Sequence, residues 1–414
     1  MENLAALFLL RPEVTFLNHG SFGACPRPVF EQYQRWQLQL ESQPVAFLDP
    51  NRGLSGWMRE ARVSLAGEIG TAPDNIVGVT NATYALNIVA QSLDLHEGDE
   101  ILTTDHEYAA LEKTWAYVCR RTGAKVVVVD VPLPLTSEAQ FTGAIAAGFT
   151  DRTRVLFLSH ITSATSLVFP IAPAIAEARK RGIFSVIDGA HTPGHIALNL
   201  DRLDADFYAG NCHKWLMAPK GSAFLQVRPE LQGMLNPLVI SHGWTADARV
   251  PGTAGVFGNT PFVDGLEMQG TRDPSAWLSV PAAIRFRQDH DWPKVAETCR
   301  RLAWETAARV RAFTGLPAFS TPEFCAPQMV SMPVPRCVPL DLQRTLIAEY
   351  GIEIPCFDWK NHTIVRVSVQ GYNTQSQMDL LVTALTDILP RLSEQLQPGN
   401  RPGNGSASAK GDDG

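Results

Sequence analysis

Short, continuous apolar runs rich in β-branched residues recur along the first part of the chain. They lie at residues 76–80, 101–104, 125–130, 154–159, 184–188, 206–209 and 222–227. Runs without polar alternation are typical of strands buried on both faces of a parallel sheet. Between them, residues 82–93, 112–122 and 171–182 have the apolar spacing of helices. The pattern predicts a doubly wound α/β domain, with a mainly parallel seven-stranded sheet flanked by helices.

The pattern changes after residue 274. Helical spacing covers residues 276–288 and 292–313, strand-like runs cover 328–334 and 364–369, and a final helix is expected over 375–397. This combination predicts a smaller α+β C-terminal domain. The domain organisation that we expect is an N-terminal segment packing with the small domain (1–20), a large domain (21–274), the small domain (275–397) and a disordered tail (398–414).

Charge and cysteine content narrow the class of ligand. The chain has 414 residues, and Lys+Arg 35 against Asp+Glu 42 gives a net charge of −7, without a basic run that would suit nucleic acid or an anionic membrane. No uncharged stretch suggests a membrane span, and the start does not resemble a signal peptide. The seven cysteines form no CxxC pair, which argues against a disulfide framework and a zinc site. We therefore expect a cytoplasmic protein that acts on a small molecule without a bound metal.

Lys214 and Asp188 are the most informative residues. Asp188 ends one strand-like run, and Lys214 follows a later run in the turn Gly210-Asn211-Cys212-His213-Lys214. Pyridoxal phosphate (PLP) needs a buried carboxylate beside its ring nitrogen and a lysine amine for its Schiff base. Either residue alone has an ordinary interpretation, as a helix cap or a surface lysine. Together they favour a PLP site.

Other strand ends supply candidates for the rest of the coenzyme. Asn81, Ala82 and Thr83 lie between a strand and a helix, where backbone N–H groups favour an anion such as phosphate, although such residues also cap ordinary helices. His106 or Tyr108, after the next strand, could lie on one face of the pyridine ring. Plausible donors to the ring hydroxyl are His191 and Ser163, unless they make only structural hydrogen bonds.

Several segments together resemble a known family. They are residues 17–23, 80–83, 104–108, 188–191, 208–216, 218–221, 270–273 and 366–374. With these motifs the chain resembles the class V aminotransferase superfamily, and within it most closely the isopenicillin N epimerases. The resemblance implies a PLP-dependent enzyme of fold type I, a homodimer with shared active sites, a coenzyme bound as an internal aldimine and an amino-acid substrate.

The resemblance also assigns roles to individual residues. Lys214 matches the aldimine lysine, Asp188 the partner of the ring nitrogen, and His191 the residue that touches the ring hydroxyl. Further matches are the phosphate contacts His213 and Thr83, and Thr271, which reaches the phosphate from the neighbouring subunit. Tyr108 is favoured over His106 as the stacking residue, although a histidine is usual there. Arg366 matches the arginine that binds the substrate carboxylate, and Asn18, His19 and Ser21 are further substrate-binding candidates.

The reaction itself is less defined by the sequence. An epimerase acting through the Lys214 aldimine and a quinonoid carbanion needs a second acid/base on the opposite face, and Tyr108, His106 or a residue near His19 could serve. A carbon–sulfur lyase, a cysteine desulfurase or an aminotransferase would use the same carbanion, and a catalytically silent PLP sensor is a further alternative. Cys356 lies in the region where desulfurases have a mobile cysteine, but a buried structural thiol is the commoner explanation for such a residue.

Overall fold

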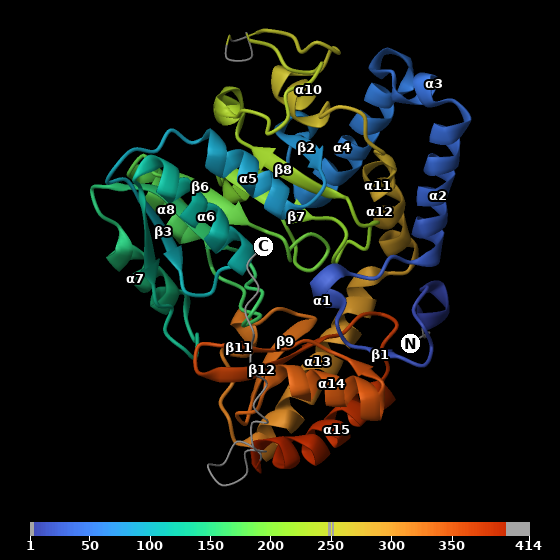
Figure 1. The fold of residues 1–414 in the computed structure, drawn as a ribbon, viewed down its shortest axis with the longest axis vertical. Coiled ribbons are helices and arrows are strands. Elements are labelled where there is room, and N and C mark those ends of the chain that lie inside the picture. Colours follow the sequence, from blue (N-terminus) through green and yellow to red (C-terminus); the bar gives the residue numbers. More distant parts are fainter. Residues whose placement is uncertain (1–3, 247–249, 251, 395–414) are drawn as a thin grey trace, which may run out of the picture.

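The computed structural model describes residues 4–246, 250 and 252–394. Figure 1 shows a large sheet with its helices in the upper part and a smaller sheet with its helices in the lower part. The large sheet contains β2 (Ile76–Val79), β3 (Glu100–Thr104), β4 (Lys125–Val129), β5 (Thr153–Ser159), β6 (Phe184–Asp188), β7 (Phe207–Asn211) and β8 (Ala223–Val227). All seven coincide with the predicted apolar runs.

The strand order in this sheet is β2-β8-β7-β6-β5-β3-β4. Strand β8 runs antiparallel to both of its neighbours, and the other pairs are parallel. The predicted mainly parallel seven-stranded sheet is thus confirmed. The expectation that every run is buried on both faces is wrong for β4, whose Val126 and Val128 side chains are exposed because β4 lies at the edge of the sheet.

Helices cover both faces of the sheet, because neighbouring residues of one strand belong to different hydrophobic clusters. Ile76 packs in one cluster and Val77 in the other, and Leu102 and Ile101 divide in the same way. The predicted helices correspond to α5 (Ala82–Ser92), α6 (Ala109–Thr122) and α8 (Ala172–Lys180). Further helices of this part are α7 (Glu138–Gly148), α9 (Leu200–Leu203) and α10 (Pro261–Glu267).

The N-terminal helices were not predicted. They are α1 (His19–Phe22), α2 (Arg27–Ser42), α3 (Pro44–Leu48) and α4 (Ser55–Ile69). The segment predicted as one helix over 276–288 is instead two helices, α11 (Ser275–Leu278) and α12 (Val280–Asp289), separated at Ser279. Short helical turns complete the chain at Leu4–Leu7, Pro50–Leu54, Pro73–Asn75, Pro229–Met234 and Pro322–Phe324.

The lower domain consists of an antiparallel sheet and three long helices. The sheet has the order β11-β12-β9, formed by Cys356–Trp359, His362–Ser368 and Met329–Val334. The helices are α13 (Trp292–Thr314), α14 (Pro339–Tyr350) and α15 (Gln375–Glu394), of which α14 and α15 lie below the sheet in Figure 1. The predicted small α+β domain is therefore present. The last three residues of the helix predicted over 375–397 and the tail predicted over 398–414 lie outside the described residues. No helix that the structure describes is long and apolar enough to cross a membrane.

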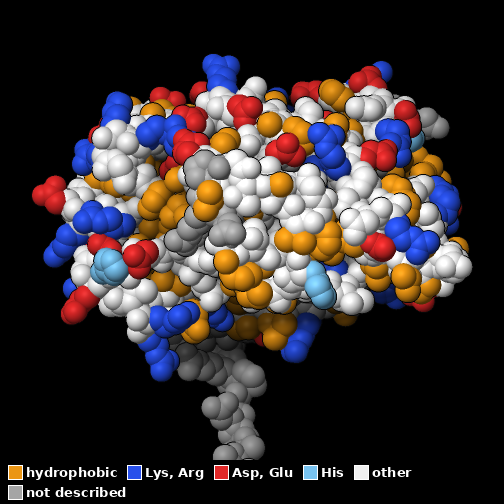
Figure 2. Space-filling model, turned by 90° about the horizontal axis from the view of Figure 1, so that it is seen from above, with side chains coloured by type: hydrophobic (Ala, Val, Ile, Leu, Met, Phe, Trp, Pro, Cys, Tyr) orange, Lys and Arg blue, Asp and Glu red, His pale blue; other side chains and the backbone are white. Residues whose placement is uncertain are grey.

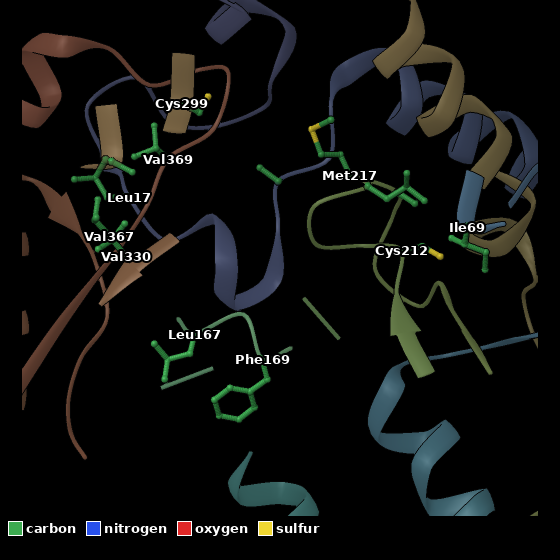
Figure 3. Packing of buried hydrophobic residues seen from close by; sticks show 14 of the residues in the cluster. Leu17, Ile69, Leu167, Phe169, Cys212, Met217, Cys299, Val330, Val367 and Val369 are labelled. Atoms are coloured by element: carbon green, nitrogen blue, oxygen red, sulfur yellow. The ribbon is translucent and has the colours of Figure 1, made fainter. Parts of the chain in front are cut away.

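The N-terminal segment connects the two parts of the molecule. Strand β1 (Thr15–Phe16) pairs in parallel with β10 (Ile352–Glu353), and Leu17 is fully buried. Figure 3 shows Leu17 near Val330 and Val367 of the small domain, while Cys212 and Met217 of the same cluster lie toward the large domain. One hydrophobic cluster thus extends through both domains, and α1 lies between them in Figure 1. This packing holds the turn that carries Lys214 against the small domain.

Candidate active site

A cavity of about 350 Å³ opens at the carboxyl ends of β5, β6 and β7, where Ser159, Asp188 and Asn211 are its lining residues. Ligands bind at this edge in open α/β sheets. The cavity brings together many of the predicted residues: Ser21, Asn81, Ala82, Thr83, Tyr108, Ser163, Asp188, His191, His213 and Lys214. The other predicted residues, Asn18, His19, His106, Thr271 and Arg366, do not line it directly.

Lys214 extends into this cavity from the turn after β7. Its Nζ lies 3.0 Å from Nε2 of His191. Burial lowers the pKa of Lys214 from 10.5 to about 7; the nearby Asp188 opposes this change, and the Arg366 charge adds to it. A lysine with such a pKa is substantially uncharged near neutral pH, and only the uncharged amine can attack a carbonyl group.

Two buried carboxyl groups lie at the same end of the sheet. Asp188 accepts a hydrogen bond from the Ala190 N–H at 2.8 Å, and burial raises its pKa, although this bond and Lys214 oppose the shift. Glu107 accepts from the Ser159 N–H at 2.8 Å and from the Ser159 hydroxyl at 2.6 Å, and burial raises its pKa to about 8. Only Asp188 lines the cavity, which makes it the carboxyl group available to a ligand.

The beginning of α5 also lines the cavity. Asn81 caps this helix, since its Oδ1 accepts from the Tyr84 N–H at 2.8 Å, and the Ala82 N–H is bound by Oδ1 of Asn211 at 2.9 Å. Both groups therefore have partners within the chain. In contrast, Nδ1 of His213 is buried without a hydrogen-bond partner among the described residues. The His213 nitrogen and the Thr83 hydroxyl at the helix start can therefore donate hydrogen bonds to an anion in the cavity.

Arg366 reaches the cavity region from β12 of the small domain and is buried. Its Nη1 donates to the Ser163 carbonyl at 2.6 Å and to Oγ of Ser163 at 3.0 Å, and its Nη2 donates to Oγ of Ser21 at 3.1 Å. Both serines line the cavity. Within the described part of the chain, no carboxylate forms an ion pair with Arg366, and burial lowers its pKa to about 10. A buried cation without a counter-ion favours binding of an anion.

The structure separates the two candidates for the stacking residue. Tyr108 lines the cavity and is 46% exposed. His106 is fully buried behind it, where Nδ1 lies 2.7 Å from the Thr165 hydroxyl and the ring lies 4.6 Å from that of Trp359. Of the two, only Tyr108 can therefore contact a ligand in the cavity. This placement favours Tyr108.

Three other predicted residues have indirect or distant positions. His19 is fully buried, with Nε2 3.1 Å from the Lys214 carbonyl oxygen and Nδ1 3.0 Å from the Tyr372 hydroxyl. Asn18 accepts from the Ser21 hydroxyl, so it supports a residue that contacts Arg366. Thr271 lies in a different cavity, between α3 and α10.

Sequence reasoning did not select several lining residues. Lys220 and Phe22 line the cavity, as do Ser159 and Asn211. Asn211 could have been selected from the sequence, because it lies at the end of a strand shortly before Lys214. Cys356 does not line the cavity: its thiol points to the Ile354 carbonyl at 3.9 Å, and burial raises its pKa well above the ordinary value.

The donor set fits pyridoxal phosphate. An amine of lowered pKa can hold the aldehyde, a buried carboxyl can face the ring nitrogen, and the unpartnered His213 nitrogen can meet the phosphate at the α5 start. A mainly parallel seven-stranded sheet that presents these groups at its carboxyl edge defines a PLP-dependent enzyme of fold type I. The chain belongs to the class V aminotransferase family, whose model matches residues 24–381.

Individual relatives agree on the family but differ in reaction. An isopenicillin N epimerase of Amycolatopsis lactamdurans is 37% identical over 92% of this chain and 96% of its own length. An L-cysteine desulfhydrase of Arabidopsis thaliana is 27% identical over 91% of this chain and 88% of its own length. Among solved structures, a cysteine desulfurase of Escherichia coli superposes with a TM-score of 0.78 at 25% identity, covering 95% of this chain and 100% of the desulfurase.

Proposed function

We propose that this protein is a PLP-dependent enzyme that acts at the α-carbon of an amino-acid substrate, with epimerisation as its reaction. The observation that carries the proposal is the pairing of an amine of lowered pKa, Lys214, with a buried guanidinium that lacks a counter-ion, Arg366. The first group reacts with an aldehyde and the second binds a carboxylate. The similarity to an isopenicillin N epimerase along nearly the whole chain favours this reaction.

Each residue of the site has a separate role in the proposed reaction. Arg366 holds the substrate carboxylate, which places the α-carbon toward Lys214. Bound pyridoxal phosphate supplies the electron sink that makes the α-proton acidic. Asp188 would keep the ring nitrogen charged, and His213 and Thr83 would hold the phosphate. The Lys214 amine, with its pKa of about 7, can accept the α-proton of the substrate near neutral pH.

Epimerisation requires a second group that delivers a proton to the other face of the α-carbon, and Tyr108 is the candidate. The sequence offered Tyr108, His106 or a residue near His19: Tyr108 lines the cavity and has an acidic hydroxyl, His106 is buried outside it, and near His19 the lining residues are Ser21, which accepts from Arg366, and Phe22, which has no acidic proton. Tyr108→Phe should therefore abolish racemisation and still allow exchange of the α-proton with deuterium from solvent. Equal loss of both activities would remove Tyr108 from this role.

Carbon–sulfur lysis is the second candidate, because a cysteine desulfhydrase is similar along most of the chain. A desulfhydrase expels sulfide and needs no protein thiol at the site. A desulfurase does need one, and no cysteine of the described residues lines the cavity. The absence of such a thiol favours simple elimination over sulfur transfer as the alternative to epimerisation.

One assay separates these reactions. The purified protein would be incubated in deuterated water with a panel of L-amino acids, and in parallel with L-cysteine and cystine. The proposal predicts deuterated D-product without release of pyruvate or sulfide. Pyruvate and sulfide from the sulfur substrates would indicate a lyase, a keto acid with conversion of the coenzyme would indicate an aminotransferase, and binding without any turnover would indicate a sensor.

We further propose that two copies of the chain complete the site. Thr271 lies in a cavity of about 620 Å³, lined also by Val45 and Leu48, and does not reach the cavity of its own chain. Exposed large side chains occur nearby in sequence at Ile240, Trp244 and Val256. Figure 2 shows groups of exposed hydrophobic side chains among charges of both signs on the upper face of the molecule. Light scattering should give the mass of a dimer, and a monomer that retains full activity would refute the proposal.

A further inference from the structure

The side chains of Trp215 and Lys214 contact the two different nitrogen atoms of the His191 imidazole. Nε1 of Trp215 donates a hydrogen bond to Nδ1 of His191 at 3.3 Å, and Nε2 of the same imidazole lies 3.0 Å from Nζ of Lys214. The three side chains form a chain of contacts in which His191 is the central member. The order of donors and acceptors along it can be derived from chemistry.

The indole nitrogen has a proton and no lone pair for a hydrogen bond, so it can act only as a donor. Nδ1 of His191 must therefore accept. In the neutral imidazole the ring proton must then reside on Nε2, the nitrogen that faces Lys214. An N–H group in this position can donate to the lone pair of an uncharged amine, whereas it would oppose an ammonium group.

The position of the indole is itself firmly fixed. Trp215 is fully buried, and the His195 ring stacks on it at 3.8 Å with an interplanar angle of 17°. Nη1 of Arg287 donates to the Trp215 carbonyl at 3.0 Å. The backbone of His191 is held as well: Nε2 of His195 accepts from the Gln328 N–H at 3.1 Å, which leaves Nδ1 of His195 to donate to the His191 carbonyl at 3.1 Å.

We propose that Trp215 is a positioning residue whose indole N–H holds His191 in the tautomer protonated on Nε2, so that His191 donates to the uncharged amine of Lys214. The inference deepens the proposed function, on which it rests, by assigning how the chain keeps its lysine ready to react. Trp215 does not line the cavity, so it acts through His191 and does not touch the ligand.

The charges around this pair are consistent with a neutral imidazole. Burial and the neighbouring Lys214, Arg366, His195 and His213 all lower the pKa of His191. Around Lys214, Asp188 favours the charged amine and Arg366 opposes it. None of these neighbours determines which imidazole nitrogen carries the proton. The hydrogen bond from Trp215 does.

The first test measures the pKa of Lys214 in the full-length chain after removal of the coenzyme. The rate of dinitrophenylation at Lys214 would be followed by peptide mass spectrometry between pH 5 and pH 11. In Trp215→Phe, His191 is free to place its proton on Nδ1 and to accept from an ammonium group through Nε2. The pKa of Lys214 should then rise by about one unit, with about a tenfold lower rate at pH 6.

The matched control is Trp277→Phe. Trp277 is also buried, but its indole nitrogen has no hydrogen-bond partner among the residues that the structure describes. This variant loses a similar packing volume and should leave the Lys214 profile unchanged. An unchanged profile in Trp215→Phe, or an equal shift in both variants, would overturn the proposal.

A second measurement needs no Trp215 variant and remains decisive if Trp215→Phe fails to fold. Nitrogen chemical shifts of ¹⁵N-histidine in the wild-type chain distinguish the two tautomers, and His191→Gln identifies the His191 signals. A proton on Nε2 supports the proposal, and a proton on Nδ1 overturns it. Neither measurement requires coenzyme binding, so a failure of this inference is distinct from a failure of the proposed function, which a coenzyme titration of the wild-type chain would reveal.

Discussion

Replacement of Arg366 by glutamine should weaken the use of carboxylate substrates far more than it weakens the fold. A guanidinium has five N–H donors. Three of them are used by the Ser163 carbonyl, the Ser163 hydroxyl and the Ser21 hydroxyl. The Nε–H has no partner among the described residues, and one Nη2–H also remains. These two N–H groups remain for a substrate carboxylate, whose two oxygens can each accept one hydrogen bond.

The expected magnitude follows from this geometry. Loss of a desolvated, charge-assisted pair of hydrogen bonds costs about 2 to 4 kcal/mol, so kcat/KM should fall by about 30- to 1,000-fold. The loss should be mainly in KM if the carboxylate contact is equally strong in the ground state and the transition state. Stability should change little, because the variant removes a buried charge that has no carboxylate partner.

The assay compares an amino acid with the corresponding amine that lacks the carboxyl group. In the wild type, conversion of the bound coenzyme by the amino acid should be much more efficient, and Arg366→Gln should reduce this difference. Arg366→Lys retains the charge without the fork and should be intermediate. If Arg366→Gln impaired the reactions of the amine and the amino acid by the same factor, Arg366 would not be the carboxylate site.

Three further predictions concern other parts of the site. Asp188→Asn should bind the coenzyme but react at least roughly a hundredfold more slowly, because the ring nitrogen loses its charge; single-turnover kinetics at wild-type rate would exclude the role. With a Lys214 pKa of about 7, the rate at which the coenzyme attaches should rise about tenfold from pH 6 to pH 8 and then level off, since only the neutral amine reacts; a rise that continues to pH 10 would indicate an ordinary lysine. Cys356→Ser should retain wild-type turnover, because this thiol does not line the cavity; complete loss of activity would favour a desulfurase.

Much of the fold could be predicted because the strands are short apolar runs, and such runs indicate burial from their composition alone. The seven runs became β2 to β8, and the site lies where three of them end. The N-terminal helices could not be predicted in this way. Helix α2 contributes only two buried residues, Val29 and Leu40, and the partly buried Trp36 donates its indole N–H to the Leu278 carbonyl of α11. The few apolar residues of α2 follow a helical period, but the segment is predominantly polar, so a search for apolar content did not reveal it.

The site shows a similar division. Lys214 and Asp188 could be selected because their chemistry is specific to one coenzyme, and their positions at strand ends follow from the sheet. The direction of individual side chains in loops could not be predicted from the sequence, as His106 and Tyr108 show. Contacts between distant segments also could not be predicted from the sequence. The serines that hold Arg366, for example, come from α1 and from the loop after β5. The hydrogen bond from Trp215 to His191 depends in the same way on packing between segments.

The covalent link between the coenzyme and the chain can be tested most directly by reduction with borohydride. The holoprotein would be reduced and digested, and the peptide that carries the phosphopyridoxyl group would be identified by mass spectrometry. We expect the group on Lys214 and on no other lysine, with Lys220 of the same cavity as the internal control. A reduced adduct on Lys220, or a coenzyme that binds tightly but is never fixed to the peptide containing Lys214, would show that the catalytic amine has been assigned wrongly.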